Sequence, residues 1–140
     1  MFKFRIEKVS ADVVWPVRHK VMYPDMDFES IKLDEDADGI HLALYGDDDN
    51  TLISVVSFFK KPGELQFRKF ATYEEYQGKG YGSALLNYIV GYAKSNSIKR
   101  IWCNARKNAT GFYQKAGFQQ TDKTFYKDGY DFVIMELHLK

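Results

Sequence analysis

The chain has 140 residues, which is the size of one domain and enough to bury a core. Hydrophobic residues make up 45% of it, which excludes a disordered chain, and no stretch approaches the length of a membrane span. The formal net charge is +1 without any block of Lys and Arg, which argues against nucleic acid as a partner. Residues 1–5 lack the apolar run of a signal peptide, so we expect a cytoplasmic protein.

The first half of the chain predicts a strand, a helix, a short second helix and then three more strands. Alternating apolar and charged residues in Phe2–Val9 are typical of a half-buried strand. Ser10 can cap a helix that runs to Val21 with Pro16 inside its early turns. Residues 22–38 are less regular, and here we expect a short helix near residues 28–32 followed by an acidic loop. The strands expected next are residues 40–45, 52–60 and 65–71, the first two joined by a hairpin loop.

The second half alternates helices and strands. A glycine-rich loop leads into a helix from about Tyr81 to Ser95, whose predicted apolar stripe is Ala84, Leu85, Tyr88, Ile89, Tyr92 and Ala93. A buried strand over residues 98–103 and a short helix over residues 109–115, which Gly117 can end, come next. Two strands near residues 118–125 and 130–139 complete the chain. These elements predict a single α+β domain, residues 1–140, with a mixed, mainly antiparallel sheet flanked by helices.

The glycine-rich loop, residues 75–86, is the most informative feature of the sequence. Gly78, Gly80 and Gly82 alternate with other residues where a strand pattern gives way to a helix pattern. Glycine allows positive φ and close approach of a ligand, and the start of a helix offers unpaired N–H groups to an anion. A phosphate-bearing ligand is one interpretation, and a tight turn into a core helix is the other.

Two common phosphate-binding motifs do not fit this loop. A dinucleotide-binding loop needs a third glycine at the sixth position and an acid after the next strand, but Ser83 and Asn104 stand there. A P-loop needs Ser or Thr after Gly-Lys, but Gly80 follows Lys79.

No metal site is expected. Asp34–Gly39 matches the first half of a calcium loop, but Tyr45 stands where the bidentate Glu belongs, which favours a solvated acidic loop. The three histidines are scattered. Cys103 is the single cysteine and is expected to be a small buried hydrophobic residue.

The pattern Gln77-x-x-Gly80-x-Gly82, followed downstream by Phe112-Tyr113-x-x-x-Gly117-Phe118, resembles the GNAT superfamily of acetyl-coenzyme A-dependent N-acetyltransferases. Either motif alone is weak, whereas the ordered pair at this spacing is specific. The resemblance covers residues 65–118 well and implies a GNAT-type fold. It also implies acetyl-coenzyme A as cosubstrate and a primary amine of a small molecule or peptide as acceptor.

The resemblance assigns roles to individual residues. The backbone of the strand before the loop would pair with the pantetheine arm, the loop would bind the pyrophosphate, and two asparagines would lie near the coenzyme path. The implied cofactor-binding residues are Phe70, Ala71, Thr72, Gln77, Gly78, Lys79, Gly80, Tyr81, Gly82, Ser83, Asn104 and Asn108. Asn108 is equally well explained as a helix cap.

Tyr113 matches the tyrosine that protonates the departing thiolate in this superfamily, and its alternative role is packing beside Phe112. The matching position for a carboxylate base is Gln66, which cannot take a proton, so Glu64, His41 or a chain of waters remains for that role.

Arg68 could hold an acidic group of the substrate, and a surface salt bridge explains it equally well, so Arg68 and His41 are the candidate substrate residues. The resemblance implies that residues 22–38 correspond to the segment that sets acceptor specificity in this superfamily. Other acyl donors, an O-acceptor, or a non-catalytic coenzyme A-binding module remain alternatives, and the oligomeric state, a homodimer included, is left open.

Overall fold

A computed structural model describes residues 3–140, so Phe2 of the first predicted strand lies outside the described residues. The chain divides into two compact units. Unit 1 comprises Met1–Phe59 and Lys69–Leu85, and unit 2 comprises Lys60–Arg68 and Leu86–Lys140. Two strands and one helix contribute residues to both units.

Unit 1 contains the first helix and the first strands. In chain order these are β1 (Phe4–Val9), α1 (Ala11–Met22), the 3₁₀ turns η1 (Phe28–Ile31) and η2 (Asp34–Asp38), β2 (Ile40–Gly46), most of β3 (Leu52–Lys61), the end of β4 (Glu64–Thr72), the 3₁₀ turn η3 (Glu74–Tyr76) and the start of α2 (Tyr81–Ser95). β1 pairs antiparallel with β2, and β2 pairs antiparallel with β3.

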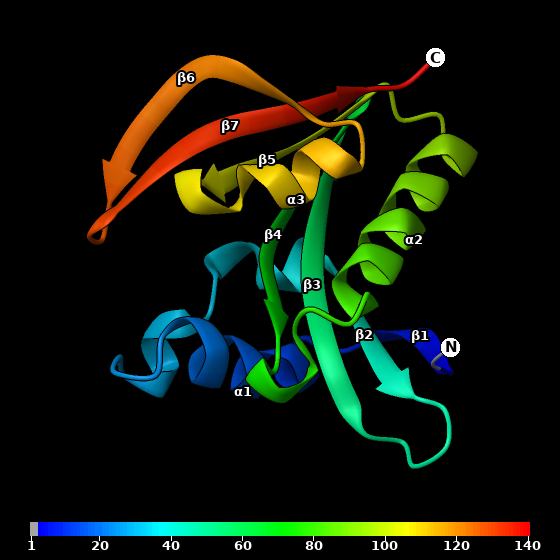
Figure 1. Cartoon of the computed structure of the whole chain (residues 1–140), viewed down its shortest axis with the longest axis vertical. Helices are drawn as coiled ribbons and strands as arrows, with labels where there is room; N and C mark the ends of the chain where they lie inside the picture. The colour runs from blue at the N-terminus through cyan, green and yellow to red at the C-terminus, as the bar shows by residue number, and fades with distance from the viewer. Residues whose placement is uncertain (1–2) are drawn as a thin grey trace. The chain divides into compact units, whose positions relative to one another are not determined.

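Unit 2 contains the start of β4, most of α2, β5 (Arg100–Arg106), the 3₁₀ turn η4 (Lys107–Ala109), α3 (Thr110–Lys115), β6 (Gln119–Lys127) and β7 (Tyr130–His138). β6 and β7 form a long hairpin, drawn in orange and red in Figure 1. β4 pairs with β5 in parallel over Glu64–Gln66, and β5 pairs antiparallel with β7. The seven strands follow the order β1-β2-β3-β4-β5-β7-β6, which confirms the predicted α+β fold with a mixed, mainly antiparallel sheet.

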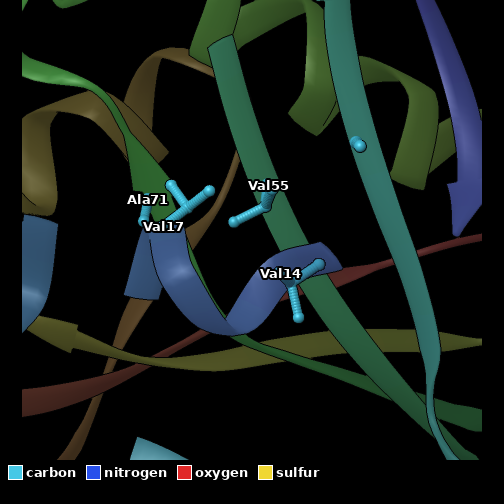
Figure 2. Packing of buried hydrophobic residues seen from close by; sticks show 5 residues of the cluster. Val14, Val17, Val55 and Ala71 are labelled. Atoms are coloured by element: carbon cyan, nitrogen blue, oxygen red, sulfur yellow. The ribbon is translucent and has the colours of Figure 1, made fainter. Parts of the chain in front are cut away.

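The core of unit 1 joins helix α1 to the sheet. Val14 and Val17, one turn apart on α1, are completely buried with Ala43 of β2, Val55 of β3 and Ala71 of β4 (Figure 2). Because positions i and i+3 lie on one face of a helix, the valine spacing that predicts the helix also defines its buried face.

Most predicted elements are found within one or two residues of their expected bounds, and three details differ. Ser10 does stand at the N-cap of α1, but its hydroxyl binds Asp12 rather than a helix amide. The stripe predicted on α2 is wrong at Tyr88, which is 42% exposed, and it omits Leu86, which is buried at 1%. The acidic segment is a 3₁₀ turn rather than an open loop. Within residues 3–140, no helix is long and apolar enough to cross a membrane.

Candidate functional site

The glycine loop has the geometry that an anion site requires. Gly78 and Gly80 have φ values of 76° and 94°, in the left-handed region that favours glycine. The first backbone bond of α2 runs from the Ala84 amide to the Gly80 carbonyl at 3.1 Å. The amides of Tyr81, Gly82 and Ser83 therefore precede the intrahelical ladder, at the positive end of the helix dipole. The loop is exposed from Gln77 to Gly80 and carries the cationic side chain of Lys79.

The end of β4, where the coenzyme arm is expected, has an edge without a strand partner. β4 neighbours only β3 and β5 in the described sheet, and its register with β5 ends at Gln66. Towards β3, the Tyr73 amide donates to the Ile53 carbonyl at 3.0 Å. Since backbone groups alternate in direction along a strand, those of Phe70 and Thr72 face the other edge and those of Ala71 face β3. Phe70, Ala71 and Thr72 are the strand residues predicted to pair with the coenzyme arm. Of these, Ala71 directs its backbone groups toward β3 and therefore away from the edge that has no strand partner.

Lys69 marks an irregularity in β4 that the sequence does not reveal. Its φ is 58°, which is unfavourable for a residue with a β-carbon. Its side chain lies over the Tyr23 ring, with the ammonium 4.7 Å from the ring centroid, and donates to the Tyr23 hydroxyl. Lysine has no preference for positive φ, so no sequence pattern could have located this distortion.

The motif around Tyr113 is explained by the way helix α3 ends. The Phe118 amide bonds the Tyr113 carbonyl at 3.1 Å, and the Gly117 amide bonds the Gln114 carbonyl at 3.0 Å. Gly117 has φ of 96°, so this is a Schellman motif with glycine in the left-handed position. The Phe118 ring, 2% exposed, lies 6.1 Å from the Tyr113 ring. The spacing Tyr-x-x-x-Gly-Phe therefore fixes both the backbone and the ring of Tyr113.

The surroundings of Tyr113 keep its hydroxyl protonated. Its ring also contacts Phe67 and Phe112, at centroid distances of 5.7 and 5.1 Å. Burial, and secondarily the nearby Cys103, raises the pKa of Tyr113 well above the usual value. Within the described chain its hydroxyl makes no hydrogen bond. This phenol can donate a proton, and it is a weaker acid than tyrosine in water.

Cys103 is buried at 2%, and burial raises the pKa of its thiol to about 12. It is therefore the small hydrophobic residue that the sequence predicts, since a protonated buried thiol is not nucleophilic.

The two asparagines of unit 2 are both exposed. Asn104 lies on β5 between the buried residues Cys103 and Ala105, so its side chain leaves the opposite face of the strand. Asn108 lies in η4 and does not cap α3, whose N-cap is Ala109 without a side-chain hydrogen bond. The alternative role of Asn108 as a cap is thus wrong. Arg68 is half-buried on β4.

His41 belongs to the interior of unit 1. It is 4% exposed, with Nε2 2.9 Å from the Asp36 carbonyl oxygen and Nδ1 2.7 Å from Ser57 Oγ. A carbonyl only accepts, so Nε2 carries the proton and Nδ1 accepts from Ser57. Both ring nitrogens are therefore engaged inside the protein. This geometry gives His41 no part in binding substrate or taking its proton, and we correct that expectation.

The network around His41 also corrects the picture of a solvated acidic loop. Asp36 is 5% exposed and accepts from both terminal nitrogens of the fully buried Arg18, at 2.8 and 2.9 Å. Burial alone would raise the pKa of Asp36. The hydrogen bonds from Arg18, the Leu33 amide and the Trp15 indole outweigh it and lower that pKa to about 2. The sequence signal for the Arg18–Asp36 pair is the position of Arg18, four residues after Val14 on the buried face of α1.

Two residues of β4 bear on the identity of the general base: Glu64, a candidate base, and Gln66, which stands at the position that matches the superfamily's carboxylate. Glu64 stands at the start of β4, with its carboxylate 3.6 Å from the guanidinium of Arg100. Gln66 pairs in register with Trp102. Within residues 3–140, no group of three or more His, Cys, Asp or Glu side chains is placed to hold a metal.

Comparison with known proteins identifies the family. The family model of the acetyltransferase (GNAT) domain matches residues 11–139, so the chain belongs to the GNAT acetyltransferases. The enzyme class is therefore that of the acyltransferases.

Three relatives illustrate the match. The uncharacterised N-acetyltransferase YitI of Bacillus subtilis is 30% identical over 129 residues, covering 86% of this chain and 85% of YitI. A Lactobacillus plantarum protein assigned to the N-acetyltransferases has a TM-score of 0.87 at 20% identity, covering 99% of both chains. A Bacillus subtilis acetyltransferase solved in complex with CoA has a TM-score of 0.74 at 19% identity over the whole of both chains. At these identities the two structures show the fold alone.

Proposed function

We propose that this chain, as a single domain over residues 1–140, is a cytoplasmic N-acetyltransferase. It moves acetyl from acetyl-coenzyme A directly to a primary amine of a small molecule or peptide. The observation that carries the proposal is the glycine loop, with positive φ at Gly78 and Gly80 and with the first amides of α2 preceding the intrahelical bond from Ala84 to Gly80. A relative of the same fold was solved with CoA, which supports this ligand class.

The residues of this chain would hold the cosubstrate at two kinds of groups. The amides of Gly78–Ser83 are suited to the pyrophosphate, with Lys79 adding charge. The outward backbone groups of Phe70 and Thr72 are suited to the amides of the pantetheine arm, as in strand addition. Asn104 and Asn108 are exposed polar groups with side chains available for further contacts. Acetyl-coenzyme A supplies a thioester, whose carbonyl carbon accepts the amine nitrogen while the carbon–sulfur bond breaks.

Tyr113 is the proposed general acid. Its hydroxyl gives a proton to the departing sulfur, the neutral amine loses a proton to water as the amide forms, and the Tyr113 phenolate then regains a proton from the solvent, so no net proton is gained or lost. The raised pKa of Tyr113 keeps the phenol protonated at working pH, which is the form that the role requires. With His41 engaged in the interior and Glu64 paired with Arg100, water is the proposed acceptor of the amine proton. Arg68 stays a candidate for holding an acidic group of the substrate.

The charge distribution favours a cationic acceptor. Unit 1 carries fourteen acidic and eight basic residues, and unit 2 carries five and twelve. Within residues 22–38, the segment that the superfamily resemblance links to acceptor choice, one Lys stands with six exposed acids, Asp25, Asp27, Glu29, Asp34, Glu35 and Asp38, while the seventh acid, Asp36, is buried against Arg18. Free amines are cations at neutral pH, so an acidic surface raises their local concentration.

A thiol-release screen with acetyl-coenzyme A tests the proposal. The amine panel contains a monoamine, a diamine, an amino acid, and peptides with either basic or acidic residues. We expect thiol release above the amine-free blank, fastest with the dicationic or basic acceptors. No release with any amine would contradict the proposed activity, and preference for an acidic peptide would contradict the cationic acceptor.

A further inference from the structure

Two hydroxyls, that of the buried Ser54 and that of the half-buried Thr72, fix the end of β4 against β3. Ser54 of β3 is fully buried, and its Oγ lies 3.1 Å from the Ala71 carbonyl oxygen and 2.7 Å from Thr72 Oγ1. A carbonyl oxygen only accepts, so the Ser54 proton points to Ala71 and the Thr72 hydroxyl donates to Ser54. This assignment satisfies both hydroxyls and sets the side-chain orientation of Thr72.

The side chain of Gln77 fixes the same residue from the loop. Its Nε2 donates to the Thr72 carbonyl oxygen at 2.8 Å, so the bond spans the whole η3 turn. Gln77 is the C-cap of that turn, and the glycine loop begins at the next residue. The bond therefore joins the last residue of β4 to the first residue of the phosphate-binding motif.

The Gln77 bond is made at the edge of β4 that faces away from β3. Because the backbone of Tyr73 is bonded to β3, that of Thr72 points to the opposite edge. A carbonyl oxygen has two lone pairs, so the Thr72 carbonyl keeps one for an incoming N–H group. Gln77 can thus hold the strand end without blocking it.

When a ligand contacts both the strand edge and the loop amides, its affinity depends on the distance between these two groups. Coenzyme A is such a ligand in the proposed function, because its arm and its pyrophosphate are covalently joined. A ligand that contacts only the loop does not depend on this spacing, so its affinity is unaffected when the spacing becomes variable.

We infer that Ser54, Thr72 and Gln77 form a brace that sets the distance between the strand edge and the phosphate loop, with Gln77 acting as a positioning residue rather than a phosphate ligand. The inference rests on the proposed binding of coenzyme A. It revises the role of Gln77, which the sequence resemblance made a direct cofactor contact.

Gln77→Ala, which changes an exposed side chain and therefore spares the fold, tests the brace. Calorimetry gives the Kd of coenzyme A and of 3′-phospho-ADP, its nucleotide half. We expect coenzyme A to bind about 3- to 10-fold more weakly, the value of one lost hydrogen bond, while the Kd of 3′-phospho-ADP stays within about 2-fold. Gln120→Ala, an exposed glutamine on β6, is the control and should change neither Kd.

Thr72→Val is an independent test of the same inference, because it removes the hydroxyl and keeps the shape of the side chain. We expect the same selective loss for coenzyme A, with thermal unfolding recorded to verify the fold.

Three outcomes would contradict the inference that Gln77 is a positioning residue. Equal weakening of both ligands by Gln77→Ala would make Gln77 a phosphate ligand and overturn the brace. Unchanged or tighter binding of coenzyme A would also overturn it. Failure of the wild-type protein to bind coenzyme A would instead refute the proposed function, and the inference with it.

Discussion

The buried pair of Arg18 and Asp36 makes the acid stability of this protein predictable. The pKa of Asp36 is about 2 in the folded chain against an ordinary value of 3.8, and each pKa unit corresponds to about 1.4 kcal/mol. At pH values above the unfolded pKa, ionised Asp36 therefore stabilises the fold by about 2–3 kcal/mol. Because the folded pKa is the lower one, this contribution is lost as pH falls from about 5 to below 2.

Asp36→Asn removes the ionisation and leaves the Arg18 charge buried without its partner. We expect a loss of about 3–5 kcal/mol in the free energy of unfolding near neutral pH. Because the variant lacks the titrating group, the difference in unfolding free energy between variant and wild type should narrow by about 2–3 kcal/mol between pH 5 and pH 1.5. Urea unfolding at a series of pH values measures this gap.

Val14→Ala is the matched control on the same helix. Val14 is completely buried and has no titrating group, so its gap from wild type should stay constant with pH. A gap for Asp36→Asn that is equally independent of pH would show that Asp36 is not an ionised, stabilised partner of Arg18, and would refute the reasoning.

Other predictions concern the site. Gly80→Asp should abolish detectable coenzyme A binding in calorimetry while circular dichroism shows an intact fold. The reason is that a β-carbon is strained at φ 94° and the added carboxylate repels phosphate. Unchanged affinity would refute the assignment of the loop as the phosphate site. Gly117→Ala should lower stability by about 1 kcal/mol in urea unfolding, since φ is 96° there, and no loss would contradict the Schellman motif. Turnover should persist in EDTA, and recovery by calcium after chelation would show that a metal site exists. Since the pKa of Tyr113 is raised, kcat should show no alkaline fall from this group below about pH 10, and a fall that Tyr113→Phe removes would contradict that.

Much of the fold follows from the sequence because its patterns are local. The valine spacing of α1 and the alternation of the strands reflect burial of one face, and the positive φ of Gly117 follows from the need to end α3. The strand order does not follow from such patterns, because the parallel pairing of β4 with β5 joins segments far apart in the chain.

The geometry of the candidate site could be predicted only where glycine or a motif marks it. The positive φ of the glycine loop and the packing of Tyr113 on Phe118 belong to that class. The interior roles of His41 and Asp36 depend on contacts between α1, η2 and β3, and the one local signal for them is Arg18, placed four residues after the core residue Val14. The brace at Thr72 likewise depends on Ser54, eighteen residues away on another strand.

Transfer of isotope-labelled acetyl to an amine tests the central claim most directly. The wild-type protein, labelled acetyl-coenzyme A and an acceptor found in the screen are mixed, and the products are resolved by mass spectrometry. The account predicts label on the amine nitrogen, formed about 10²- to 10⁴-fold more slowly by Tyr113→Phe at saturating acetyl-coenzyme A. Label found only in free acetate would contradict the proposed transfer, and equal rates for the two proteins would contradict Tyr113 as the acid.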